Sequence, residues 1–88
     1  MEQFTVEVPG IYNGVGDQVV FLTGKTPDLA IVKGNASGRY FAVLAYGDRK
    51  NLLVNTTDPY QGTVIVPQKT MIVEVIAIGN WSIEVTAK

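Results

Sequence analysis

The chain has 88 residues, no cysteine and no histidine, and a formal net charge of -1. Disulfide scaffolds, thiolate metal sites and histidine-based catalysis are therefore excluded. A chain of this length has room for one domain, which buries only about 60 to 65% of the surface that the unfolded chain exposes. Hydrophobic residues make up 47% and charged residues 17%, a composition typical of a folded globular domain.

The seven cationic residues are spread singly along the sequence, apart from the adjacent pair Arg49 and Lys50. Nucleic-acid binding requires a clustered basic surface, so we expect no nucleic-acid partner. The first six residues lack the basic region and apolar run of a secretory signal. No stretch approaches the roughly 20 apolar residues of a membrane-spanning helix. The sequence thus predicts a soluble protein without an export signal and without membrane insertion.

Apolar and polar residues alternate with a period of two along most of the chain, whereas helical spacing is absent, which predicts strands. The expected strands are residues 3–8, 18–23, 29–33, 39–46, 51–55, 61–66, 71–78 and 81–86. Clusters of Gly, Asn, Asp and Pro separate them, and we predict that residues 13–17 and 34–38 form turns. The Gly79-Asn80 turn predicts that the last two strands pair as a hairpin.

About eight short strands with a turn signal in every gap favour an all-β fold. The prediction is a single antiparallel β-sandwich domain over residues 1–88, of jelly-roll or immunoglobulin-like type and without substantial helix. Residues 1–8 form an N-terminal strand or an arm that adds a strand to the sheet of a neighbour. Trp81 is large enough to be a central core residue between the two sheets.

Several polar motifs have a functional and a structural interpretation. The segment Gly14–Asp17 looks like a phosphate loop, but a β-branched strand follows it where such a loop needs a helix, so we expect a turn capped by the Asp17 side chain. Asp17, Asp28, Asp48 and Asp58 all fall in predicted loops. They are candidates for calcium binding, although aspartate is also a preferred turn residue. We predict no metal and no cofactor, with calcium left open.

Catalytic groups are hard to assemble from this sequence. Glu74 and Glu84 become cross-strand neighbours if the last hairpin forms, which is the arrangement that a glycoside hydrolase needs; the simpler interpretation is that both face solvent. No nucleophile, base and oxyanion donor can be combined. We therefore predict no catalytic residues and no enzyme activity.

The tyrosines are the remaining candidates for a binding site. Tyr12, Tyr40, Tyr46 and Tyr60 lie near strand ends or in loops, where they can stack on sugars or anchor a protein interface. Alternatively, they close the ends of the core and extend their hydroxyl groups into water. Tyr60 is the first candidate because it follows the turn residues Asp58 and Pro59.

Five segments in order resemble a small all-β module of bacterial secreted proteins and lipoproteins, over nearly the whole chain from residue 14 onward. They are Gly16–Val20, Arg39–Val43, Leu52–Asn55, Tyr60–Gly62 and Trp81–Val85. The resemblance implies a sandwich with a binding or structural role and no catalytic residues. Those modules usually follow an export signal or lie within a longer chain. A free-standing domain is, by architecture, similar to phage capsid decoration or cement proteins.

We therefore predict a non-enzymatic structural protein that decorates a phage capsid at the virion surface, with the capsid lattice as its protein partner. The apolar run 71–78 would leave excess hydrophobic surface on a monomer, which favours a homo-oligomer. The alternative is a carbohydrate-binding or cell-surface adhesion module, at the bacterial surface or outside the cell. In that case the four tyrosines form the platform for a glycan.

Overall fold

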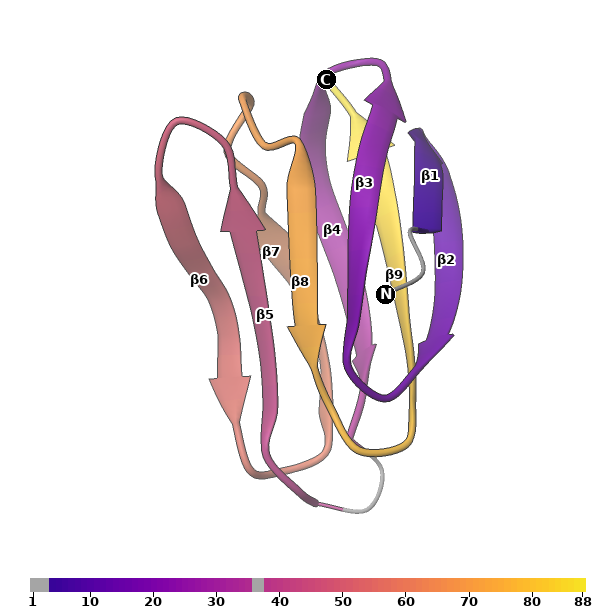
Figure 1. Ribbon diagram of the computed structural model, residues 1–88, viewed down its shortest axis with the longest axis vertical. Coiled ribbons are helices and arrows are strands. Elements are labelled where there is room, and N and C mark those ends of the chain that lie inside the picture. Colours follow the sequence, from indigo (N-terminus) through magenta and orange to yellow (C-terminus); the bar gives the residue numbers. More distant parts are fainter. Residues whose placement is uncertain (1–3, 36–37) are drawn as a thin grey trace.

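The computed structural model describes residues 4–35 and 38–88 of the chain. Within these residues the chain forms nine β-strands in two sheets that pack face to face (Figure 1). The strands are β1 (Phe4–Val8), β2 (Gly10–Val15), β3 (Gln18–Gly24), β4 (Pro27–Gly34), β5 (Phe41–Tyr46), β6 (Lys50–Thr56), β7 (Tyr60–Ile65), β8 (Ile72–Ile76) and β9 (Asn80–Ala87). The described residues include no helix that could span a membrane. The predicted all-β sandwich is confirmed.

The strand pairing is that of a rolled-up hairpin. One sheet has the order β1-β3-β8-β5-β6 and the other β2-β9-β4-β7. From β2 onward the first strand pairs with the last and the second with the second last, so that β2 pairs with β9, β3 with β8, β4 with β7 and β5 with β6. This nested antiparallel pairing defines a jelly roll. Of the two predicted topologies, jelly-roll and immunoglobulin-like, the structure adopts the jelly roll.

The N-terminal part of the chain contributes one strand to each sheet. β1 lies at the edge of the five-stranded sheet, parallel to β3 of its own chain, and β2 lies at the edge of the other sheet beside β9. Pro9, which lacks a backbone N–H, separates them. The predicted turn over residues 13–17 is wrong, because residues 13–15 continue β2 and only Gly16 and Asp17 turn the chain. The start of the predicted arm, residues 1–3, lies outside the described residues.

The predicted hairpin between the last two strands is also wrong. β8 lies between β3 and β5, whereas β9 lies between β2 and β4 in the opposite sheet. The turn at Gly79 therefore crosses from one sheet to the other. The loop after β2 holds this crossover, since the Gly16 N–H donates to the Gly79 carbonyl at 2.9 Å and Asp17 Oδ1 accepts from the Ala77 N–H at 2.8 Å. Asp17 does not cap its own turn, contrary to prediction.

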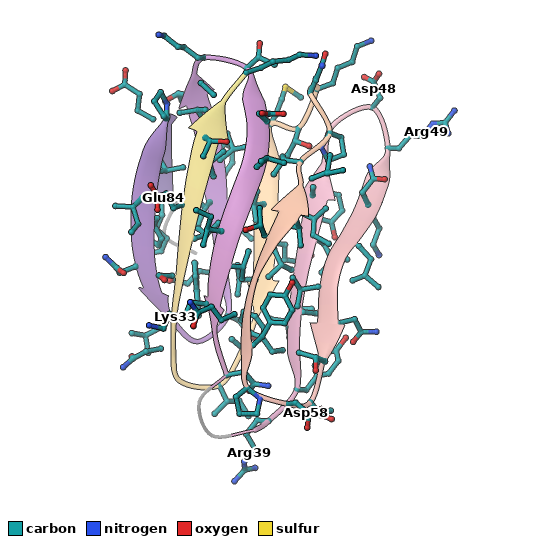
Figure 2. The ribbon with its side chains drawn as sticks, turned by 180° about the vertical axis from the view of Figure 1, so that it is seen from behind. Lys33, Arg39, Asp48, Arg49, Asp58 and Glu84 are labelled. Carbon is teal, nitrogen blue, oxygen red and sulfur yellow. The ribbon has the colours of Figure 1, made fainter. Side chains whose placement is uncertain are left out.

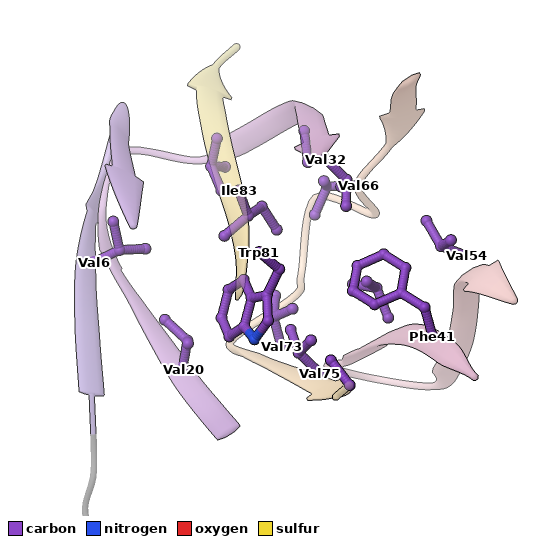
Figure 3. Packing of buried hydrophobic residues seen from close by; sticks show 14 of the residues in the cluster. Val6, Val20, Val32, Phe41, Val54, Val66, Val73, Val75, Trp81 and Ile83 are labelled. Atoms are coloured by element: carbon purple, nitrogen blue, oxygen red, sulfur yellow. The ribbon is translucent and has the colours of Figure 1, made fainter. Parts of the chain in front are cut away.

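Trp81 lies in the middle of the core between the sheets, as predicted (Figure 3). Only 3% of its surface is exposed, and its indole Nε1 donates to the Gly16 carbonyl at 2.9 Å. Gly14 and Gly34 flank it on the neighbouring strands. A Cβ atom on Gly14 would collide with the indole ring, and one on Gly34 would lie 2.8 Å from the Trp81 Cβ and 3.2 Å from the Phe41 ring. The two glycines therefore make room for the tryptophan.

Candidate functional site

The outer face of the three inner strands of the five-stranded sheet is mostly apolar, whereas the edge strands β1 and β6 carry Glu7 and Lys50 on the same side. Along β3, β5 and β8, the residues that alternate with the core residues Val20, Val43 and Val73 point away from the core. We call this set the apolar face. Its members are Val19, Phe21, Ala42, Leu44, Tyr46, Ile72, Glu74 and Ile76. None of them belongs to the core cluster or packs against it.

The side chains of the apolar face shield one another. Ala42 and Leu44 are 1% and 8% exposed although they lie outside the core cluster, so larger neighbours on the same face must cover them. Around this face, Leu52 on β6 is 55% exposed, and Met71 and Ile78 beside the two ends of β8 are 62% and 58% exposed. The predicted apolar run 71–78 thus sends three of its eight residues, Val73, Val75 and Ala77, into the core and the other five to the outer side.

Glu74 is the single charged residue of the apolar face. Val19 and Leu44 flank it on the two neighbouring strands. The Tyr46 hydroxyl donates a hydrogen bond of 2.6 Å to Glu74 Oε1. This bond, together with partial desolvation and the negative charge of Glu74, raises the pKa of Tyr46 above its usual value of 10.0. The one carboxylate on this face is therefore bonded to a neighbour on the same face.

This bond predicts a pH dependence of stability. Because the folded state raises the pKa of Tyr46, its contribution is complete below pH 10.0 and is lost as the pH rises through the higher folded-state value. We expect the stability difference between the wild type and Tyr46→Phe to be constant at neutral and mildly alkaline pH and to shrink above that point. Urea unfolding at a series of pH values measures it. A difference that stays constant throughout the alkaline range would contradict the bond.

A row of polar side chains crosses the outer face of the four-stranded sheet. Asn13 on β2 pairs with Ser82 on β9, Ser82 with Lys33 on β4, and Lys33 with Gln61 on β7. These residues alternate with buried ones along their strands and therefore point outward. Figure 2 shows Lys33 on this side of the molecule. The row brings together four segments that are far apart in the sequence.

This polar row forms one wall of a depression of about 640 Å³, which we call the polar groove. The opposite wall consists of Val15, Asn80 and Pro59. The backbone between the two walls belongs to Gly14, Trp81, Gly34 and Tyr60. The groove therefore runs across the strands, at the end of the sheet where β4 leads into the loop before β5.

Asn35 directly follows Gly34, which lines the groove. It follows β4 in the left-handed region, with a φ of 62°, and is 1% exposed. Its Nδ2 donates to the Asp58 carbonyl at 2.8 Å and its Oδ1 accepts from the Arg39 N–H at 2.9 Å. Because this side chain binds the loops beyond the strand, it adds nothing to the second wall. Of the turn predicted at residues 34–38, positions 36 and 37 lie outside the described residues.

The four predicted tyrosines do not form one platform. Tyr12 packs on the inner side of β2 against Phe4 and Trp81, with ring centroids 5.6 and 5.7 Å apart. Tyr40 lies before β5 and is 49% exposed, and Tyr46 belongs to the apolar face. Tyr60 packs against the core and also lines the polar groove. Of the four, Tyr60 alone lines this groove.

The acidic candidates are also dispersed. Asp48 pairs with Lys69 at 3.1 Å on the surface, and among the residues that the structure describes no three acidic groups lie close enough to hold a metal ion. Glu74 and Glu84 point outward from opposite sheets and are not cross-strand neighbours. The carboxylate pair considered for glycoside hydrolysis is therefore not formed by these two residues.

Sequence reasoning missed the polar groove. Its walls come from β2, β4, β7 and β9, and only the register between these strands brings the side chains together. The one local signal was Tyr60 beside the Asp58-Pro59 turn.

No known protein-family model matches the chain, and none of the curated proteins is similar to it in sequence. The resemblance to the bacterial module and the likeness to capsid decoration proteins therefore stay predictions. What the structure shows is a small all-β protein of two sheets.

Proposed function

We propose that the protein is a non-enzymatic structural protein, a capsid decoration protein of a phage, which attaches to the capsid lattice through its apolar face. The observation that carries this proposal is the outer face of the three inner strands of the five-stranded sheet, β3, β5 and β8, where Glu74 is the single charge among eight side chains. A contiguous apolar patch on the surface can serve as a site of association.

The size of the apolar face favours attachment in many copies. Three strands about 4.8 Å apart, with five residues rising about 3.3 Å each, give a footprint of somewhat more than 200 Å². A stable interface between two proteins buries roughly 800 Å² on each partner. One copy therefore holds weakly through this face alone, and copies joined as a homo-oligomer on a repeating lattice hold through avidity.

The difference between the two outer faces supports the same function. The four-stranded sheet carries on its outer side a row of polar groups that includes Lys33, beside exposed apolar residues such as Ile31. The strands β3, β5 and β8 carry no cation on theirs, and Lys50 lies on the edge strand β6. A protein that decorates a particle needs one side suited to the particle and another suited to water. Jelly rolls also occur in viral capsid proteins, an analogy of architecture that does not by itself assign function.

Co-sedimentation tests this proposal. The purified protein is mixed with empty capsids of the phage whose major capsid protein gene neighbours its own gene. We expect saturable binding with a copy number set by the symmetry of the lattice. A compact monomer that does not sediment with the particles at any concentration would overturn the proposal.

The second candidate function is that of a carbohydrate-binding or cell-surface adhesion module, at the bacterial surface or outside the cell. The polar groove favours it, because Tyr60 and several amide side chains line one depression. A glycan array separates the two functions, since reproducible sugar binding without affinity for capsids would favour adhesion.

A further inference from the structure

The polar groove contains hydrogen-bonding groups that have no partner among the described residues. Five polar side chains line it, namely those of Asn13, Lys33, Gln61, Asn80 and Ser82. Within the described part of the chain, none of them makes an intramolecular hydrogen bond or ion pair. By contrast, the polar residues Asn35 and Thr86 bond to the backbone. The five side chains of the groove are thus free to bind a ligand.

The charge of the groove selects an anionic group at one position. Lys33 is the single charged residue that lines it, and no carboxylate does. Glu84 lies on the same outer face, opposite Ile31 in the next outward row, and is not paired with Lys33 (Figure 2). Asp58 precedes Pro59 at the end of the sheet but does not line the groove. Lys33 therefore offers an ammonium group to a ligand at the centre of a row of neutral polar groups.

The neutral side chains suit a ligand with many hydroxyl groups. An amide has both donors and an acceptor, so Asn13, Gln61 and Asn80 can each bind a pair of neighbouring hydroxyl groups. Between them, Val15 and Pro59 offer apolar surface against which the C–H face of a sugar can lie. An apolar ligand would leave the five polar groups unsatisfied, which is unfavourable.

The shape of the groove suits a short linear chain. It crosses four strands, which at a spacing of about 4.8 Å corresponds to roughly 14 Å between the outer two. The Asn35 side chain bonds to the Asp58 carbonyl and the Arg39 N–H and does not line the groove. A ligand can therefore extend along the polar row with its charged group near Lys33.

We propose that the polar groove binds an acidic oligosaccharide, with Lys33 pairing with a sugar carboxylate and the amide side chains binding the hydroxyl groups of adjoining sugars. This inference does not depend on the capsid proposal, because the groove and the apolar face lie on opposite sides of the sandwich. A copy attached through the apolar face would present the groove to the surroundings.

The test is an NMR titration of the isotope-labelled protein with trigalacturonic acid, and in parallel with its methyl ester, which has the same ring hydroxyls but no charge. We expect the acid to shift the backbone amide signals of Gly14, Gly34 and Trp81, and the ester to bind at least fivefold more weakly. Lys33→Gln should reduce binding of the acid to the level of the ester. Lys69→Gln, which removes a cation at the opposite end of the molecule, should change nothing.

Two further variants test the amides. Asn13 and Asn80 are exposed. We expect Asn13→Ala and Asn80→Ala each to weaken binding of both the acid and the ester about threefold or more. The proposal is overturned if millimolar acid does not shift the amide signals of Gly14, Gly34 and Trp81, or if Lys33→Gln binds the acid as tightly as the wild type does. It is also overturned if triglutamate, an acidic peptide, shifts the same signals more strongly than the acid does. If the acid does not shift these amide signals while the protein still binds capsids, this inference alone is refuted.

Discussion

Replacing Trp81 with alanine is expected to lower the free energy of unfolding by about 3 to 5 kcal/mol, the range observed when large buried aromatic side chains are truncated. The indole is 3% exposed, packs at the centre of the core and bonds to the Gly16 carbonyl. Gly14 and Gly34, which make room for it, would border an empty cavity. A domain of this size has a total stability of roughly 4 to 13 kcal/mol, so the variant should lose a large part of it and unfold at a much lower urea concentration.

Urea unfolding measures this effect. It is followed by circular dichroism and not by tryptophan fluorescence, because the variant has lost the single tryptophan of the chain. Val15→Ala is the matched control: it lies next in sequence to Gly14 on β2 but is 65% exposed. We expect the control to change stability by less than about 0.5 kcal/mol. A loss below about 1 kcal/mol for Trp81→Ala would show that the indole does not fill the core as described.

Replacing Ile76 with lysine should abolish attachment to capsids. Ile76 points outward on β8, opposite Ala42 on β5. A lysine there puts an unpaired ammonium group into an interface that must exclude water, at a cost typical of hot-spot residues, at least about 2 kcal/mol. We expect the affinity for the particles to fall by about 30-fold or more, measured by co-sedimentation over a range of protein concentrations.

The matched control makes the same change on the other sheet. Ile31 lies on the outer face of β4 and is 40% exposed, and Ile31→Lys should leave capsid binding within about twofold of the wild type, as expected for a site outside the interface. Circular dichroism and thermal unfolding check that both variants are folded. If the two variants lose affinity equally, the apolar face is not the attachment surface.

The fold class could be predicted from the sequence because the alternation of apolar and polar residues records local burial. This alternation located eight of the nine strands, and the size of Trp81 identified it as a core residue. β2 was missed because Asn13 and Gly14 are typical turn residues. Gly14 is a strand residue here since the indole of Trp81, on a strand distant in sequence, occupies the space of its side chain.

The pairing of strands and the site were harder to predict, because both depend on contacts between distant segments. A Gly-Asn turn serves a hairpin or a crossover between sheets equally well, and the neighbours of β8 and β9 decide between them. The polar row has no local signature, since Asn13, Lys33, Gln61 and Ser82 become neighbours only through the register. The apolar run 71–78, in contrast, pointed correctly to exposed hydrophobic surface at Met71 and Ile78.

The nested pairing also bears on how the protein forms during synthesis. β9 lies between β2 and β4, so the four-stranded sheet has no hydrogen-bonded link between its two parts until residues 80–87 have left the ribosome. Until then β2 and β4 expose their pairing edges, and the growing chain is prone to associate with other nascent chains. The four-stranded sheet can therefore be completed only after β9 has emerged, and the pairing of β2 with β9, which is distant in sequence, is expected to slow folding.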